Sequence, residues 1–247
     1  MDEKKTHFGY EDVSWQEKQS RVNQVFSSVA KRYDVMNDLM SLGLHRLWKD
    51  EAVRMLSPQE GETILDLAGG TGDLSKRILK RMHGRGRVIL TDINLNMLRE
   101  GVKRFDRTGQ FSDLDYGVVN AEALPFQDAS LDAITIAFGL RNVRDQATAL
   151  AEMFRVLKPG GRALILEFSK MKGPLAKPYD WYSFHILPKM GQLVTGDADS
   201  YRYLAESIRK HPEQVVLKTM LEQAGFSEVH YRNILQGLVA IHLARKA

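Results

Sequence analysis

Hydrophobic and polar residues alternate along this chain in blocks whose period switches between that of a strand and that of a helix. Short apolar runs predict buried strands, and apolar residues spaced three or four apart predict amphipathic helices. The predicted strands are Thr63–Leu67, Val88–Thr91, Asp115–Val119, Leu131–Ala137 and Arg162–Phe168. The predicted helices between them are Asp73–Met82, Leu95–Phe105 and Arg144–Leu157, with a short helix or turn at Ala121–Leu124. This alternation favours an α/β fold with a doubly wound, mostly parallel, Rossmann-like sheet.

The two ends of the chain depart from this alternation. Residues 1 to about 15 are polar and predict an arm, after which helical spacing runs from Val22 through Met40 and again from Leu47 to Leu56. The last helix is expected at Glu213–Ala224. Two further strands, Val229–Leu235 and Leu238–Ala244, flank Gln236-Gly237 and predict an antiparallel edge hairpin. We therefore divide the chain into an N-terminal arm with helices (residues 1–60) and an α/β domain (residues 61–247).

A glycine-rich turn follows the first predicted strand of the α/β domain. That strand carries Asp66 to the segment Ala68-Gly69-Gly70-Thr71-Gly72, and the next strand ends in Asp92. Glycine permits positive φ angles and lets a ligand approach the backbone. An acid at the end of the second strand commonly accepts hydrogen bonds from ribose hydroxyls. The two features together predict a ligand that contains a nucleoside.

A dinucleotide and S-adenosylmethionine are the two nucleoside ligands to weigh. The dinucleotide pattern Gly-x-Gly-x-x-Gly fails, because Ser75 stands where the last glycine should be. Asp66 and Asp73 flank the turn, where they would repel a pyrophosphate but attract the ammonium and sulfonium of S-adenosylmethionine. The turn resembles the first motif of class I S-adenosylmethionine-dependent methyltransferases, with Ala68 in place of its first glycine.

Composition limits the remaining choices. The chain has 247 residues, 43% of them hydrophobic, no cysteine and a net charge of +4. Without cysteine there is no disulfide, zinc thiolate or thiol nucleophile, which fits a reducing cytoplasm. We expect no signal peptide and no membrane span, and we find no cluster of residues resembling a metal site. The modest positive charge, without an appended RNA-binding module, argues against nucleic acid as a partner.

A long connection, residues 169–211, separates the last parallel strand from the last helix. It is rich in aromatic residues and methionine, and it leaves the carboxyl end of the sheet, where ligands bind in such folds. It is therefore either a lid that contacts the substrate or a small satellite core over the sheet edge. Its lysines, Lys170, Lys172, Lys177 and Lys189, stand among the apolar residues.

Several segments together resemble the ubiquinone/menaquinone biosynthesis C-methyltransferases. They run from Thr6 nearly to the C-terminus and are the segments 6–9, 25–30, 33–41, 65–73, 120–126, 138–143, 157–161 and 197–208. The resemblance implies methylation of a ring carbon on a prenylated quinol, with S-adenosylmethionine as donor and no metal. It accounts for Ala68, which this family also carries.

The resemblance also implies site residues. Those for the cofactor are Thr71, Asp92, Asn120 and Ala121, to which the glycine-rich turn itself adds Asp66, Gly70 and Gly72. Ala137 replaces a serine that the family commonly uses. Those for the substrate are Arg141, Asn142 and Tyr201. We expect Arg141 to stabilise a phenolate and not to act as a base, because arginine stays protonated. We expect Asn142 to orient a quinol oxygen. Arg141 could instead be a surface or capping residue, Tyr201 ordinary helix packing, and His185 a core histidine.

Partners and location follow from the same resemblance. A polyprenyl acceptor would be drawn from a bilayer, so we expect a cytoplasmic protein that associates peripherally with the inner face of the cytoplasmic membrane. The sequence leaves open which quinol is used, and whether the chain forms a homo-oligomer or joins a quinone-biosynthesis complex. The alternatives are a methyltransferase for another small phenolic or lipid acceptor, and a regulatory protein that binds S-adenosylmethionine without catalysis.

Overall fold

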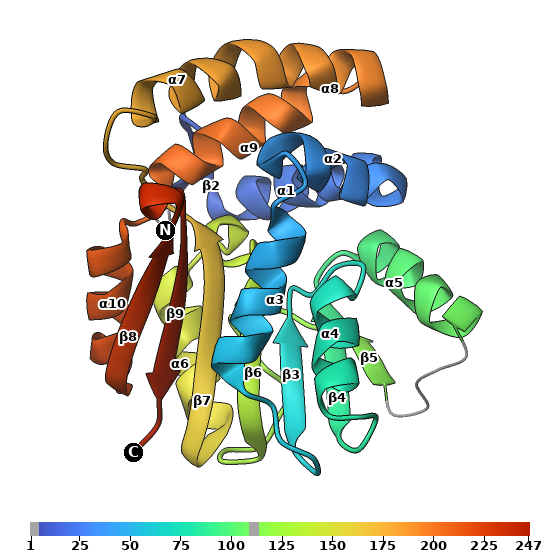
Figure 1. Cartoon of the computed structure of the whole chain (residues 1–247), viewed down its shortest axis with the longest axis vertical. Coiled ribbons are helices and arrows are strands. Elements are labelled where there is room, and N and C mark those ends of the chain that lie inside the picture. The colour runs from blue at the N-terminus through green and yellow to red at the C-terminus, as the bar shows by residue number, and fades with distance from the viewer. Residues whose placement is uncertain (1–4, 109–113) are drawn as a thin grey trace.

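A seven-stranded sheet forms the centre of the molecule (Figure 1). The computed structural model describes residues 5–108 and 114–247. The strands, in spatial order, are β5 (Leu114–Val118), β4 (Arg87–Asp92), β3 (Thr63–Leu67), β6 (Leu131–Ala137), β7 (Leu157–Phe168), β9 (Val239–Arg245) and β8 (Ser227–Ile234). The first five are mutually parallel, whereas β9 and β8 pair antiparallel. The predicted doubly wound sheet with an antiparallel C-terminal edge hairpin is confirmed.

Helices cover both faces of the sheet, because the central strands are apolar on both sides. The helices α3 (His45–Leu56), α4 (Asp73–Arg81) and α5 (Leu95–Thr108) contribute to one core, and α6 (Gln146–Val156) and α10 (Gln214–Gln223) to the other. Within β3, Ile64 enters the first core while Leu65 and Leu67 enter the second. This two-residue alternation is that of a strand buried on both faces.

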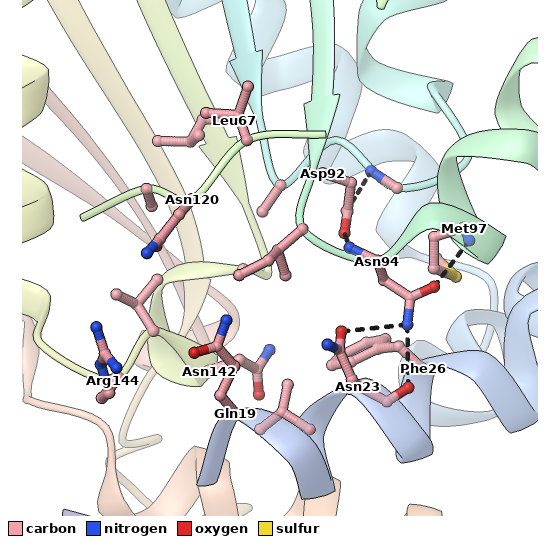
Figure 2. Close-up of a pocket in the computed structure, with 18 of the residues that line it drawn as sticks. Gln19, Asn23, Phe26, Leu67, Asp92, Asn94, Met97, Asn120, Asn142 and Arg144 are labelled. Atoms are coloured by element: carbon pink, nitrogen blue, oxygen red, sulfur yellow. Dashed lines mark hydrogen bonds between the residues drawn. The ribbon is translucent and has the colours of Figure 1, made fainter. Parts of the chain in front are cut away.

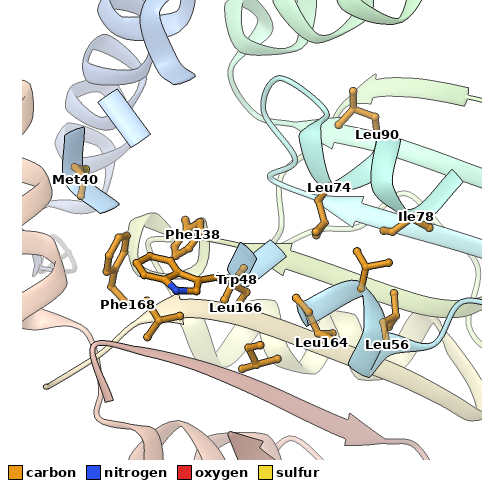
Figure 3. Packing of buried hydrophobic residues seen from close by; sticks show 14 of the residues in the cluster. Met40, Trp48, Leu56, Leu74, Ile78, Leu90, Phe138, Leu164, Leu166 and Phe168 are labelled. Carbon is orange, nitrogen blue, oxygen red and sulfur yellow. The ribbon is translucent and has the colours of Figure 1, made fainter. Parts of the chain in front are cut away.

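An aromatic cluster fixes the chain where β6 ends. Trp48 of α3 meets Phe168 edge-on with ring centroids 6.0 Å apart, and Phe168 lies 4.9 Å from Phe138 (Figure 3). Phe138, the first residue after β6, has a positive φ of 57°. Such backbone strain persists only where the surroundings hold the residue, so this cluster positions the turn that follows.

A helical cap closes the end of the sheet to which the parallel strands point (Figure 1). Its N-terminal part is α1 (Trp15–Val29), the 3₁₀ turn η1 (Ala30–Arg32) and α2 (Tyr33–Ser41). Its second part, from the long connection, is α7 (Ala176–Trp181), the π-helical turn η3 (Tyr182–Ile186), α8 (Leu187–Thr195) and α9 (Ala198–Lys210). The Tyr182 hydroxyl donates to the Leu39 carbonyl over 2.9 Å. The two parts therefore form one layer above the sheet.

Three local predictions were wrong. The described part of the predicted polar arm forms an antiparallel ribbon, β1 (Lys5–Phe8) with β2 (Glu11–Ser14), because Phe8 stacks on Tyr203 of α9 with centroids 4.1 Å apart. The helical run from Val22 to Met40 is broken at η1. Residues 158–161 belong to β7 instead of closing a helix, since their backbone pairs with Lys246 beyond β9.

Candidate active site

A cavity of about 810 Å³, including its open mouth, lies where β3, β4 and β6 end. Residues after these strands form one wall, and α1 closes the opposite side with Gln19, Val22, Asn23 and Phe26 (Figure 2). Five predicted site residues line this cavity: Gly70, Asp92, Asn120, Ala121 and Asn142. The ends of adjacent parallel strands meet at one sheet edge, which is why residues so far apart in sequence converge.

The glycine-rich turn is packed tightly beneath the cavity. Ala68, Gly70 and Gly72 all have positive φ angles, of 51°, 58° and 75°. A Cβ on Gly69 would lie 2.7 Å from Asp66 Oδ2, and one on Gly70 would lie 3.0 Å from Met97 Cε. At Gly69 and Gly70 the turn therefore has no room for a side chain, and it presents its backbone to the cavity.

Asp92 is held by backbone donors. Its Oδ2 accepts from the Gly70 amide over 2.9 Å and its Oδ1 from the Asn94 amide over 2.8 Å. Burial nevertheless raises the pKa of Asp92 to about 6, because desolvation outweighs these hydrogen bonds. Asn94 in turn donates from Nδ2 to the Asn23 carbonyl and the Ser27 hydroxyl of α1. The ribose position predicted for Asp92 is thus linked to the helix that closes the cavity.

Asp66 and Thr71 face a second cleft next to the cavity. Asp66 is fully buried, and its carboxylate accepts from the Ser75 and Thr135 hydroxyls over 2.6 and 3.0 Å. Burial raises the pKa of Asp66 to about 6. Thr71 accepts from Arg104 Nη1 over 3.3 Å, and Gly72 lies outside the cavity as the N-cap of α4. Apart from Gly72, the predicted cofactor residues therefore line two adjoining spaces.

Arg141 lies behind the cavity wall. It belongs to the turn η2 (Leu140–Asn142) and is buried, with Nη1 donating to Glu167 Oε1 over 2.7 Å and to the Phe138 carbonyl over 2.6 Å. Its guanidinium also lies 5.7 Å from the Phe168 ring centroid. Burial raises the pKa of Glu167 despite the cation beside it. The interaction of Arg141 with substrate stays a prediction.

The other two predicted substrate residues lie in different surroundings. Asn142 lines the cavity and accepts at Oδ1 from the Tyr203 hydroxyl over 2.9 Å. Tyr201 is fully buried in α9, against Gly191 of α8. His185 is exposed and its ring stacks on Trp181. The roles of Asn142 and Tyr201 remain predictions, while the alternative of a core histidine at His185 is wrong.

Sequence reasoning missed the contribution of the N-terminal segment and of α3 to this site. Asn23 and Phe26 of α1 point into the cavity toward Asp92 and Asn94 (Figure 2). Lys49 of α3 lines the second cleft. One signal was available for Asn94, because an asparagine two residues after a strand-end acid can cap the next helix. Its Oδ1 indeed accepts from the Asn96 and Met97 amides.

The described residues contain neither a metal-binding cluster nor a membrane-spanning helix. No three histidine, aspartate or glutamate side chains in residues 5–108 and 114–247 are grouped so that they could hold a metal ion. Nor does any helix there combine the length and the apolar surface needed to cross a bilayer.

The fold is that of the class I methyltransferases. A methyltransferase of Aquifex aeolicus described as dependent on S-adenosylmethionine is similar, with a TM-score of 0.62 at 17% identity over 87% of this chain and 98% of that one. Phosphoethanolamine N-methyltransferase 2 of Haemonchus contortus superimposes with a TM-score of 0.66 at 17% identity, over 95% of this chain and 60% of that one. At 17% identity, these two similarities establish a shared fold and nothing beyond it.

Sequence comparison assigns the family. The model of the ubiE/COQ5 methyltransferase family matches residues 14–246. The ubiquinone/menaquinone biosynthesis C-methyltransferase UbiE of Klebsiella pneumoniae is 55% identical over 242 residues, covering 98% of this chain and 96% of that protein. The protein of the same name from Escherichia coli O1:K1 is 54% identical over the same shares. This chain belongs to the ubiE/COQ5 methyltransferase family, and it is an S-adenosylmethionine-dependent methyltransferase.

Proposed function

We propose that the protein transfers a methyl group from S-adenosylmethionine to a ring carbon of a prenylated quinol in menaquinone biosynthesis, ubiquinone biosynthesis or both. The observation that carries this proposal is the 54–55% identity to UbiE proteins over 98% of the chain. The cavity adds local support, because Asp92, Asn120 and Asn142, which we predict to contact ribose, adenine and substrate, all line it. The alternative is a methyltransferase that uses the same site for another small phenolic or lipid acceptor.

The residues present fit the cofactor. Asp92 has two acceptor oxygens at the position for a ribose, and Asn120 has an amide at the position for an adenine edge. Leu67, Ile93, Met97 and Val119 line the same cavity and supply apolar walls for a base. We therefore assign Gly70, Asp92, Asn120 and Ala121 to the nucleoside, and Asp66, Thr71 and Gly72 to the methionine half. We also propose residues 61–247 as the methyltransferase domain and residues 1–60 as its N-terminal cover.

The bound cofactor supplies an electrophilic methyl group on a sulfonium. The chain must supply an electron-rich ring carbon, which requires a phenolate although phenols ionise near a pKa of about 10. Asn142 lies on the cavity wall and can orient a quinol oxygen without moving. Arg141 can stabilise the phenolate directly only if it leaves Glu167, because the Glu167 carboxylate neutralises the guanidinium charge behind the cavity wall. Phe138 and Val143 help to keep water from the reacting atoms.

Quinone analysis by mass spectrometry tests this function. The strain should lack its own quinone C-methyltransferase and carry the wild-type chain, Asp92→Ala or Arg141→Ala at equal protein level. We expect methylated menaquinone, ubiquinone or both with the wild type, and at least a tenfold loss with either variant. Asp92→Ala removes the proposed ribose acceptor, and Arg141→Ala leaves Glu167 buried without its cation behind the cavity wall. If soluble protein that binds S-adenosylmethionine restores neither quinone, the acceptor is a different molecule.

We further propose that the protein works at the inner surface of the cytoplasmic membrane, where a polyprenyl acceptor resides. The supporting surface is the outer face of α7, η3 and α8, where Lys177, Trp181, His185, Lys189 and Leu193 recur at four-residue intervals and are all exposed. A helical face that mixes lysine with tryptophan and leucine is typical of helices that lie in a membrane interface.

A further inference from the structure

The second cleft extends the cavity toward α3. The two spaces share Tyr33, Ala68 and Phe138, and the cleft adds Lys49, Asp66, Gly69 and Asp73. A ligand whose nucleoside occupies the cavity can therefore continue into the cleft past Ala68. The cleft contains two carboxylates and one ammonium group, which is the reverse of the charges on the methionine half of S-adenosylmethionine: an ammonium, a sulfonium and one carboxylate.

Lys49 is the cation of this cleft. It lies on α3, is only 6% exposed, and its Nζ donates to Asp73 Oδ2 over 2.9 Å. A lysine ammonium has three N–H donors, and within the described ranges this is the one hydrogen bond found for Nζ. Asp73 also accepts from Arg77 Nε over 3.2 Å, so it keeps a cationic partner when Lys49 bonds elsewhere.

The neighbouring cations are placed differently. Arg46, Lys76 and Arg104 line an opening on the far side of Thr71 and Asp73. Arg46 pairs with Asp38, and Arg104 pairs with Asp34 over 2.6 Å. Among the residues that the structure describes, Lys49 is thus the cation that lines the cleft together with Asp66 and Gly69.

We infer that Lys49 binds the α-carboxylate of the cofactor's methionine half, while Asp66 and Asp73 face its cationic groups. This inference rests on the proposed function only for the identity of the cofactor, and it adds a residue that selects for the carboxylate. Burying an ammonium is costly unless it is paired, and Asp73 meets this need in the ligand-free protein. The other N–H donors of Lys49 can then bind an anion that enters the cleft.

Binding without an acceptor tests the inference. Isothermal titration calorimetry would compare S-adenosylhomocysteine with its analogue in which hydrogen replaces the carboxylate. We expect the wild type to prefer S-adenosylhomocysteine, and Lys49→Met to bind it about 10- to 100-fold more weakly, the usual effect of losing a charged hydrogen bond. Affinity for the decarboxylated analogue should change less than about threefold, because that ligand does not use Lys49.

A second buried lysine provides the matched control. Lys18 of α1 is 2% exposed and its Nζ donates to the Val143 carbonyl over 3.0 Å. Lys18→Met should lower thermal stability without changing the ratio of the two affinities. If Lys49→Met does not fold, Lys49→Gln and the wild-type ratio serve instead. Equal losses for both ligands, or a wild type that does not distinguish them, would overturn the inference. Failure to methylate any quinol would leave this ratio intact and would refute only the proposed acceptor.

Discussion

The ionised carboxylate of Asp66 lowers the stability of the ligand-free fold, although we expect the same charge to favour binding of the cofactor. It is fully buried, its oxygens accept from hydroxyl groups, and burial raises its pKa to about 6 from an ordinary value of 3.8. Because the folded chain prefers the protonated acid, ionisation destabilises the fold increasingly as pH rises from about 4 through 6. We predict that Asp66→Asn stabilises the ligand-free protein at pH 7.5 by about 2–3 kcal/mol and weakens binding of S-adenosylmethionine at least tenfold.

Chemical denaturation at several pH values checks this prediction. The gain from Asp66→Asn should shrink as pH falls from 6 to 4 and vanish below about pH 3, where Asp66 is protonated in both the folded and the unfolded wild type. Asp132→Asn is a useful contrast, because Lys158 and the Thr63 amide bind Asp132 and its pKa is lowered. That variant should lose stability at pH 7.5. A loss of stability in both variants would contradict our account of Asp66.

Ala68 and Gly139 are direct neighbours in the cavity wall, and the size that one can have depends on the other. A Cβ on Gly139 would lie 2.7 Å from Ala68 Cβ and 3.2 Å from Ile136 Cγ1. We predict that Gly139→Ala lowers stability by about 1–3 kcal/mol through this overlap. Adding Ala68→Gly should restore at least half of the loss, because Ala68 also has a positive φ that glycine adopts freely. Thermal unfolding of the double-mutant cycle measures the coupling, and strictly additive effects would refute it.

At the scale of elements, α1 forms the wall of the cavity opposite the sheet. Lys18 bonds to the Val143 carbonyl, and Asn94 bonds to Asn23 and Ser27. We predict that S-adenosylhomocysteine slows hydrogen exchange in residues 19–26 by at least about tenfold, because the ligand fills the space beneath them. The helix α10, which packs on the opposite face of the sheet, should show a smaller change. Equal protection of both helices would indicate global stabilisation instead of closure by α1.

The strands of the sheet could be predicted because their signal is local. The bounds of Thr63–Leu67 and Leu131–Ala137 agree with the structure, since a run of apolar residues is enough to define a buried strand. The ribbon β1–β2 has no such signal, being short and polar, and Phe8 anchors it to Tyr203 in a distant helix. The Arg141–Glu167 pair and the position of Lys49 in the cleft likewise depend on tertiary contacts that spacing does not encode.

On the scale of the whole molecule, exposed lysines and large apolar side chains occur together at the end formed by α7 and α8. The helices α7 and α8 form its outermost layer, beyond α9 and α2 (Figure 1). Trp181 is 59% exposed and Leu193 is 86% exposed. In residues 170–193 the single acid is Asp180, which is paired with Arg209. Residues 170–193 therefore present lysines with apolar side chains and little negative charge, a combination that suits an anionic lipid surface.

We predict that Lys177→Glu combined with Lys189→Glu reduces flotation with phosphatidylglycerol-containing vesicles by about 10- to 30-fold, since each lysine contributes about 1 kcal/mol near such a surface. The control combines Lys80→Glu with Arg85→Glu, which gives the same net charge on exposed residues at and beyond the end of α4. The α7–α8 variant should also raise KM for a long-chain quinol in vesicles while leaving KM for a short-chain quinol in solution unchanged. A change in KM for the long-chain quinol alone would show that membrane docking was altered and the active site was not. If both double variants float equally well, another face contacts the membrane and the long-chain acceptor enters from that side.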